Sequence, residues 1–179
     1  MPEVPLQRRA APELAAIWLA SAPMTRVWRA DIDEAEAVAR LLVAFRDHMG
    51  RDWPSENAFL ANVERLMERR ESEFLLGAPD DDSPPAAVAQ LRFRFGVWYA
   101  AEDCALEDLF VAEAARGAGL GRAMVDAVIE RARERGCRRI ELDTDEDNAA
   151  ALALYGAAGF RSGKGEPGRR ALFLRYHFD

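Results

Sequence analysis

Alternating glycines form the most distinctive chemical feature of the sequence. Gly117, Gly119 and Gly121 occupy every second position of the segment RGAGLGR at 116–122, between an apolar strand-like run and a helical pattern. Bare backbone can approach phosphate oxygens closely, and the N–H groups at a helix N-terminus point at such oxygens. The segment therefore predicts a turn that binds a phosphate or a diphosphate.

A dinucleotide-binding enzyme is an alternative use of such a turn. That fold requires G-x-G-x-x-G in its first βαβ unit and an acidic residue about twenty positions later. Asp143 lies at a suitable distance, but Arg122 takes the place of the third glycine and the turn comes past the middle of the chain. A P-loop is excluded, because Lys164 is the sole lysine and no G-x-x-x-x-G-K-[ST] segment exists.

Two adjacent carboxylates precede the glycine turn and could act in proton transfer. Glu107 and Asp108 lie in LEDLFV (106–111), a segment that alternates like a strand. Strand alternation sets the two side chains on opposite faces unless a β-bulge intervenes. A purely structural alternative is that they pair with Arg92 or Arg94 on the neighbouring strand.

Composition and charge narrow the class of protein. The chain has 179 residues, half of them apolar and 31% charged, which is typical of one globular domain. Its net charge of −7 argues against a general polyanion binder and favours cationic or amine-bearing partners. Cys104 and Cys137 form no spacing pattern and are expected to be free thiols in a reducing cytoplasm. Two histidines form no metal-binding motif, so no metal is expected.

The periodicity of apolar residues predicts the elements that position these groups. Period-two alternation predicts strands, whereas spacings of three and four predict helices. Strand patterns cover 25–30, 73–78, 86–100, 103–112, 138–144 and 170–178, and helical patterns cover 35–50, 57–71, 120–136 and 147–160. Asp31 and Ser55 are predicted helix caps. The strand, helix, strand succession around the glycine turn predicts a parallel pair of strands.

Three motifs in this order resemble the GNAT superfamily of acyl-CoA-dependent N-acyltransferases, over residues 25–178. Arg116 to Gly121 fits the family turn [Q/R]-x-x-G-x-[G/A], Asn148 opens the next helix, and LYGAAGF at 154–160 fits the L-Y-x-x-x-G-F signature. LEDLFV resembles more narrowly the diamine and polyamine acetyltransferases of this superfamily.

The resemblance implies a fold and a co-substrate. The fold is α/β (α+β), with a mixed, mostly antiparallel sheet of six to seven strands, a central parallel pair and about four flanking helices. We expect this domain at 24–179, after an N-terminal extension at 1–23. The implied co-substrate is acetyl-CoA. Its implied contacts are the backbone groups of Leu109, Phe110 and Val111 toward pantetheine, the main chain of Arg116, Gly117, Ala118, Gly119, Leu120, Gly121 and Arg122 around the pyrophosphate, and Asn148.

The same resemblance implies roles in catalysis. Tyr155 would donate a proton to the departing thiolate, although it could instead fill the core. An alkylamine titrates near pH 10.4 and must lose a proton before it attacks. Glu107 is the candidate base, acting through water, and Asp108 a candidate cation binder. Asp47 and Trp53 are candidates for binding a cationic acceptor, with the Trp53 ring offering its face.

The predicted reaction is transfer of an acetyl group from acetyl-CoA to a primary amine of a cationic small molecule or a peptide, by direct attack in a ternary complex. The alternative is a non-catalytic module of the same fold that senses acyl-CoA. We expect no nucleic acid and no membrane partner, a cytoplasmic location and, because many relatives pair, a homodimer. The side chain of Arg116 is either a phosphate ligand or a solvated surface charge.

Overall fold

The computed structural model describes residues 25–162 of the chain, and within them five strands form one sheet in the order β1-β2-β3-β4-β5. The strands are β1 (Arg26–Arg29), β2 (Ser72–Ala78), β3 (Ala87–Gly96), β4 (Ala101–Val111) and β5 (Arg139–Glu141). The helices are α1 (Ala35–His48), α2 (Glu56–Met67), α3 (Leu120–Glu134) and α4 (Ala149–Ala157), with short 3-10 turns η1 (Ile32–Glu34) and η2 (Glu113–Ala115).

The sheet is mixed, as the order of strands and helices predicts. Neighbouring strands from β1 to β4 are antiparallel. β4 and β5, which α3 connects along the chain, pair in parallel. The five described strands fall short of the expected six to seven. The strand predicted at 170–178 and the extension predicted at 1–23 lie outside the described residues.

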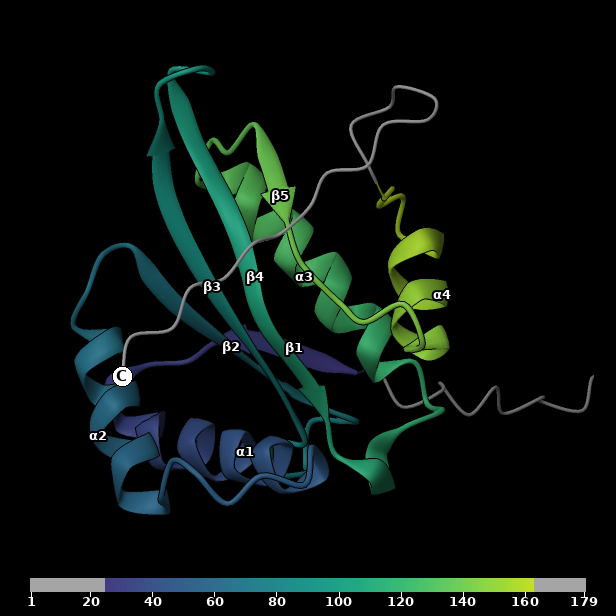
Figure 1. Ribbon diagram of the computed structural model, residues 1–179. Coiled ribbons are helices and arrows are strands. Elements are labelled where there is room, and N and C mark those ends of the chain that lie inside the picture. Colours follow the sequence, from purple (N-terminus) through teal and green to yellow (C-terminus); the bar gives the residue numbers. More distant parts are fainter. Residues whose placement is uncertain (1–24, 163–179) are drawn as a thin grey trace, which may run out of the picture.

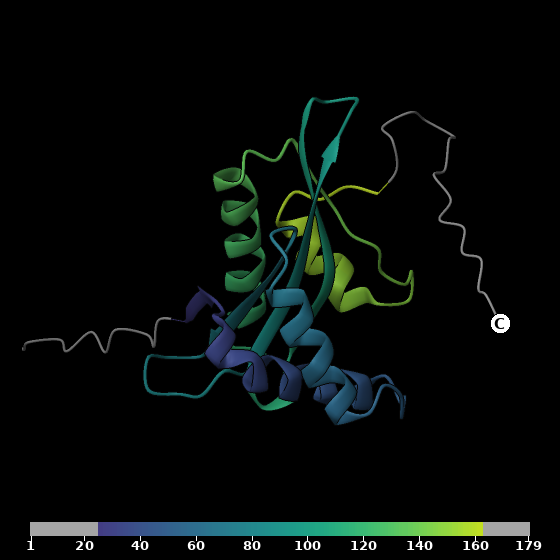
Figure 2. The same cartoon turned by 90° about the vertical axis from the view of Figure 1, so that its left-hand side faces the viewer.

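Helices cover both faces of the sheet and divide the core in two. Figures 1 and 2 show α1 and α2 on one face and α3 on the other, with α4 beside α3. On the α1 and α2 side, Val38, Leu42 and Val63 pack on Phe74, Leu76 and Val88. On the α3 side, Leu120, Met124 and Val128 pack on Leu75, Ala89 and Leu91. The apolar stripes predicted from the sequence are therefore the buried faces of these helices.

Local hydrogen bonds explain where two of the helical segments begin. The Ser55 hydroxyl accepts a hydrogen bond from the Ala58 N–H at 3.3 Å, which satisfies one free donor of α2. The Glu34 carboxylate accepts from the Asp31 N–H at 3.0 Å, the reciprocal half of a capping box. Both predicted caps are confirmed.

Gly77 on β2 allows α3 to pack close to the sheet. A Cβ atom at this position would lie 2.6 Å from Met124 Sδ and 3.1 Å from Leu120 Cδ1, both of which would have to move. Leu120 is the first residue of α3. The absence of a side chain at Gly77 therefore sets the position of the helix end that follows the glycine turn.

Among residues 25–162, none of the helices combines the length and the apolar character needed to cross a lipid bilayer.

Leu76→Ala is expected to lower the free energy of unfolding by about 2–5 kcal/mol, because it leaves a cavity in a fully buried part of the core. Leu152→Ala is the matched control, since Leu152 is 43% exposed; it should change stability by no more than about 0.5 kcal/mol. Urea denaturation measures both, and equal losses would contradict the assignment of this core.

Candidate active site

The outer edge of β4 loses its partner halfway along the strand. β4 pairs with β5 only from Asp103 to Ala105, yet it continues to Val111. Hydrogen-bonding directions alternate along an antiparallel strand, and the Ala112 N–H donates to Ala86 O on the β3 side at 2.8 Å. By this alternation Phe110 also faces β3, whereas the N–H and C=O groups of Leu109 and Val111 point away from it. Of the three predicted pantetheine contacts, Leu109 and Val111 have backbone groups on the open edge.

The glycine turn adopts backbone conformations that favour glycine. Gly117 and Gly119 both adopt φ of +85°, in the left-handed region that favours glycine. Gly119 is the N-cap of α3, where no side chain accepts a hydrogen bond from the first turn. The first-turn N–H groups of Leu120, Gly121 and Arg122 are therefore available to an anion, at the positive end of the helix dipole.

Both arginines that flank the turn use their side chains within the protein. The Arg116 N–H donates to Glu113 O at 3.1 Å, so this predicted phosphate donor is already occupied. Its guanidinium donates to Val111 O at 3.0 Å and lies 3.4 Å from His48 Nε2 on α1. Arg116 thus connects the end of β4 to the end of α1, and whether its exposed side chain also contacts phosphate stays a prediction.

Arg122 connects α3 to α4. Its guanidinium forms an ion pair with Asp126 at 2.9 Å and donates to Ala157 O at 3.1 Å. The main-chain N–H of Arg122, which is the group predicted to contact phosphate, takes no part in these bonds. The turn as a whole offers main chain, rather than arginine side chains, to a bound diphosphate.

A β-bulge places Glu107 and Asp108 on the same face of the sheet. Gln90 on β3 lies opposite Asp108, but the next residue, Leu91, lies opposite Leu106, so Glu107 is the extra residue. Leu106 and Leu109 both contact the core under α3, which leaves the two intervening residues on the other face. Both carboxylates could share a face only if a bulge interrupted the regular strand, and the structure contains this bulge.

The two carboxylates differ in their partners. Glu107 forms an ion pair with Arg92 at 2.9 Å and accepts a hydrogen bond from Gln90 Nε2 at 3.3 Å. Asp108 has no hydrogen bond or ion pair to its side chain within residues 25–162. Burial raises the pKa of Asp108 above its usual value, and the charges of Glu107 and Asp143 raise it further.

The pairing of Glu107 with Arg92 was the structural alternative for this segment. The sequence patterns did not identify two neighbours of these carboxylates: Gln90, which donates to Glu107, and Asp143, whose charge acts on Asp108. The register of the β3–β4 hairpin is the signal that places Gln90 beside them.

Helix α4 supplies the remaining predicted residues. The Asn148 side chain accepts from the Ala151 N–H at 3.1 Å, so its oxygen caps α4 and its amide N–H₂ group remains for a ligand. Tyr155, like Leu109 and Val111, packs against the core cluster under α3, and its ring lies 5.7 Å from that of Phe160. Burial raises the pKa of the Tyr155 hydroxyl, which keeps this group protonated at neutral pH.

The residues predicted to bind the acceptor lie at and after the end of α1. The Asp47 carboxylate is paired with Arg46 at 2.6 Å, and the Trp53 side chain is largely exposed. A role for Asp47 and Trp53 in acceptor binding stays a prediction. Phe110, by contrast, is buried, and its ring stacks on Phe45 with a centroid separation of 5.3 Å.

Together these groups form an open strand edge with different chemistry on its two sides. Asp108 and Glu107 lie on the α1 and α2 side of β4, and Tyr155 packs on the α3 side. The glycine turn follows the end of β4 and leads into α3. A family model described as the acetyltransferase (GNAT) family matches residues 35–160, which include all of these features. The chain belongs to the GNAT acetyltransferase family.

Known proteins support this membership. The mycothiol acetyltransferase of Renibacterium salmoninarum is 33% identical over 138 residues, which cover 73% of this chain and 38% of that protein. The aminoglycoside N(6')-acetyltransferase type 1 of Klebsiella aerogenes is 35% identical over 83 residues, 46% of this chain and 55% of that protein. The chain spans less than half the length of these mycothiol acetyltransferases.

A solved structure shows the same fold. Aminoglycoside N-acetyltransferase AAC(6')-Iy in complex with CoA aligns with a TM-score of 0.68 and 19% identity, over 87% of this chain and 96% of that chain. The GNAT fold predicted from the motifs is therefore confirmed.

Gly119→Ala is expected to lower the free energy of unfolding by about 1–2 kcal/mol, because a side chain is strained at its positive φ. Gly156→Ala is the control: Gly156 lies inside α4, a Cβ there would meet nothing within 4 Å, and alanine should stabilise by about 0.5–1 kcal/mol. Chemical denaturation without ligand should give effects of opposite sign; equal effects would contradict this geometry of the turn.

Proposed function

We propose that this protein transfers an acetyl group from acetyl-CoA to a primary amine by direct attack in a ternary complex. The observation that carries the proposal is the departure of β4 from β5 after Ala105, next to a helix N-terminus with free N–H groups. A strand edge and a diphosphate turn in series match the two polar regions of the coenzyme, the pantetheine amides and the pyrophosphate. The GNAT family to which the chain belongs uses acetyl-CoA as co-substrate.

Main-chain groups would hold and orient the coenzyme. The N–H groups of Leu120, Gly121 and Arg122 would donate to pyrophosphate oxygens, and the open edge at Leu109 and Val111 would pair with pantetheine. Val111 O already accepts from Arg116, so its free N–H is the stronger candidate for this contact. On the open edge, the Leu109 N–H would donate to the oxyanion that forms when the amine attacks the thioester carbonyl.

We propose Asp108, rather than Glu107, as the base that removes a proton from the amine. A carboxylate is a better base when its pKa is raised toward neutrality, and the pKa of Asp108 is raised by burial and by two nearby negative charges. Glu107 is engaged by Arg92 and Gln90. The charge of Glu107 would then raise the pKa of Asp108 and attract a cationic acceptor, while Glu107 itself would transfer no proton.

Tyr155 would donate a proton to the departing thiolate. Its hydroxyl has no hydrogen-bond partner within residues 25–162, and its raised pKa keeps the proton in place until the sulfur develops charge. Tyr155 packs against the same buried cluster as Leu109 and Val111, the two residues whose backbone faces the open edge. A thioester bound along that edge would therefore lie between the hydroxyl on one side and Asp108 on the other.

The acceptor is proposed to be a small molecule with a primary amine. Relatives named for mycothiol, aminoglycoside and thialysine acetylation indicate that this family scaffold accepts varied acceptors. The acidic residues Glu107, Asp108 and Asp143 near the open edge would favour a cationic acceptor. The free thiols Cys104 and Cys137 suit a reducing compartment such as the cytoplasm.

Tyr155→Phe is expected to lower turnover by about 10- to 100-fold, the low end of general-acid effects, while coenzyme affinity stays unchanged. A thiol-release assay with acetyl-CoA and a panel of amines measures the rate, and Tyr99→Phe in the exposed hairpin is the matched control. Unchanged turnover would remove Tyr155 from the chemistry. Coenzyme binding without thiol release for any amine would instead favour a non-catalytic sensor.

The base is tested by comparing Asp108→Asn with Glu107→Gln. Since Asp108 must be ionised to accept a proton, kcat/KM should fall as pH decreases through its raised pKa. Asp108→Asn should lower kcat/KM by about 100-fold and abolish this acid limb. Glu107→Gln keeps an oxygen for Arg92 and should lower kcat/KM by less than about tenfold. If Glu107→Gln instead removed the acid limb, the base would be Glu107.

A further inference from the structure

Gln90 is a buried polar residue at the boundary between the core and the open part of the sheet. On the side of β3 that faces α1 and α2, Val88 is fully buried, Gln90 is 7% exposed and Arg92 is exposed. On β4 the same boundary falls between Phe110, which is buried, and Asp108, which is partly exposed. Gln90 and Asp108 thus lie in the first polar layer next to the apolar core.

The bulge in β4 makes Gln90 the single residue of β3 that faces both carboxylates. Gln90 lies opposite Asp108 in the strand register, and the extra residue, Glu107, comes before the register resumes. In such a bulge two residues of one strand oppose one residue of the other. The Gln90 Nε2 group donates to Glu107 Oε2 at 3.3 Å. Directly opposite residues have Cβ atoms about 4.5–5.5 Å apart, so Asp108 lies beside the same amide.

The orientation of the Gln90 amide follows from its partner. A carboxylate only accepts hydrogen bonds, so the NH₂ end of the amide must face Glu107, and the carbonyl oxygen Oε1 points away from that bond. Within residues 25–162, no donor bonds to Gln90 Oε1 or to the Asp108 carboxylate. Two neighbouring oxygen acceptors in a largely buried layer therefore need a donor from a ligand or from water.

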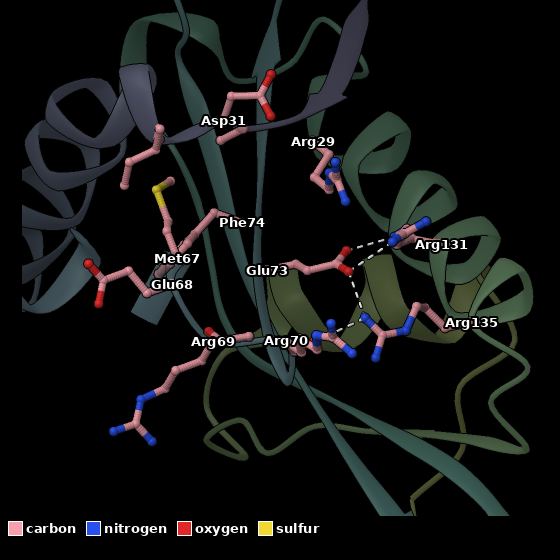
Figure 3. Close-up of a pocket in the computed structure, with 13 residues that line it drawn as sticks. Arg29, Asp31, Met67, Glu68, Arg69, Arg70, Glu73, Phe74, Arg131 and Arg135 are labelled. Carbon is pink, nitrogen blue, oxygen red and sulfur yellow. Dashed lines mark hydrogen bonds and ion pairs between the residues drawn. The ribbon is translucent and has the colours of Figure 1, made fainter. Parts of the chain in front are cut away.

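The cavity of about 450 Å³ beside Glu73 shows the opposite arrangement (Figure 3). It lies between β1, the end of α2, the start of β2 and the C-terminal end of α3. The Glu73 side chain is 9% exposed, and its carboxylate accepts hydrogen bonds from Arg131 at 2.6 and 2.8 Å and from Arg135 at 2.8 Å. The protein itself supplies the donors for this carboxylate, whereas the described residues supply none for Gln90 Oε1 and Asp108.

An ammonium group matches these two acceptors. It carries three N–H donors, whereas a hydroxyl carries a single O–H donor. Gln90 Oε1 can accept from one N–H while Asp108 accepts from another. When Asp108 takes its proton, the bonding electron pair stays on nitrogen, and the neutral amine still has an N–H for Gln90. A hydroxyl would give its only proton to Asp108, and the Gln90 oxygen would then face oxygen lone pairs.

We infer that Gln90 is an acceptor-binding residue of the active site, whose Oε1 atom holds one N–H of the incoming amine beside Asp108 and so selects amines over hydroxyl compounds. The inference rests on the proposed acetyl transfer and adds the group that orients the amine. With one N–H held by Gln90 and another given to Asp108, the nitrogen cannot rotate freely, and its lone pair keeps one direction.

The test measures binding and turnover separately. Isothermal titration of the full chain in saturating CoA, which has no acetyl group to transfer, measures the affinity for putrescine, thialysine and kanamycin. Gln90→Met removes the oxygen and should raise the dissociation constants of the amines that bind by about tenfold or more, because hydrogen bonds to charged groups are strong. Butanediol, in which hydroxyls replace the amines of putrescine, should not bind measurably to the parent protein.

Leu91→Met is the matched control, because Leu91 is the next residue of β3 and its side chain lies in the core under α3. The exchange roughly conserves volume, so this variant should bind amines like the parent protein. A second comparison uses the Glu107→Gln background. If Gln90 acted only by holding Glu107, Gln90→Met would have no effect there, whereas direct contact with the amine predicts that the tenfold effect persists.

Unchanged amine affinity in Gln90→Met, loss of its effect in the Glu107→Gln background, butanediol binding as tight as that of putrescine, or no binding of any of the three amines would overturn the inference. A thiol-release assay with acetyl-CoA and the same amines tests the reaction itself. Thiol release together with unchanged affinity in Gln90→Met would leave the proposed reaction intact and remove Gln90 from it. Amine binding that depends on Gln90, without thiol release, would support the amine site and contradict acetyl transfer.

Discussion

The site depends on unpaired main-chain hydrogen-bonding groups. β4 runs on for several residues after its pairing with β5 ends at Ala105, so Leu109 and Val111 present donors and acceptors that the sheet does not use. The first turn of α3 adds further donors directly after the strand. Because buried polar groups need partners, a ligand with amides and phosphates in series satisfies both regions. The proposed recognition through main chain would depend on glycine and strand geometry rather than on particular charged side chains.

Electrostatic roles are divided among the charged residues near this edge. Arg92 engages Glu107, and Arg116 engages Val111 O and approaches His48, so these charges are tied to the scaffold. Asp108 is left unpaired among the described residues, and burial shifts its pKa upward. A functional group is most easily tuned when its neighbours are fixed, because the field at that group is then constant. The same logic applies at Glu73, where one buried carboxylate orders two arginines of α3.

Local pattern predicted much of this structure. The apolar periodicity indicated the faces of the helices, Ser55 predicted the start of α2, and the glycines predicted the turn that precedes α3. Features that depend on strand register or on contacts between distant segments could not be predicted from local patterns. The side-chain pattern of LEDLFV does not reveal that Glu107 is the inserted residue, because only the register against β3 shows it. The cavity beside Glu73 joins segments from β1, α2, β2 and α3, and no local spacing brings them together.

The extra residue in β4 is an insertion that the two cores do not require. Because Gln90 lies opposite Asp108 and the next residue, Leu91, lies opposite Leu106, deleting Glu107 would join Leu106 to Asp108 in an unbroken register and leave Leu106 and Phe110 each in its own core. The deletion would remove one of the two carboxylates beside the open edge, together with the local twist that a bulge adds to a strand. The number of acidic groups at this edge can therefore change by one residue without repacking the interior of the protein.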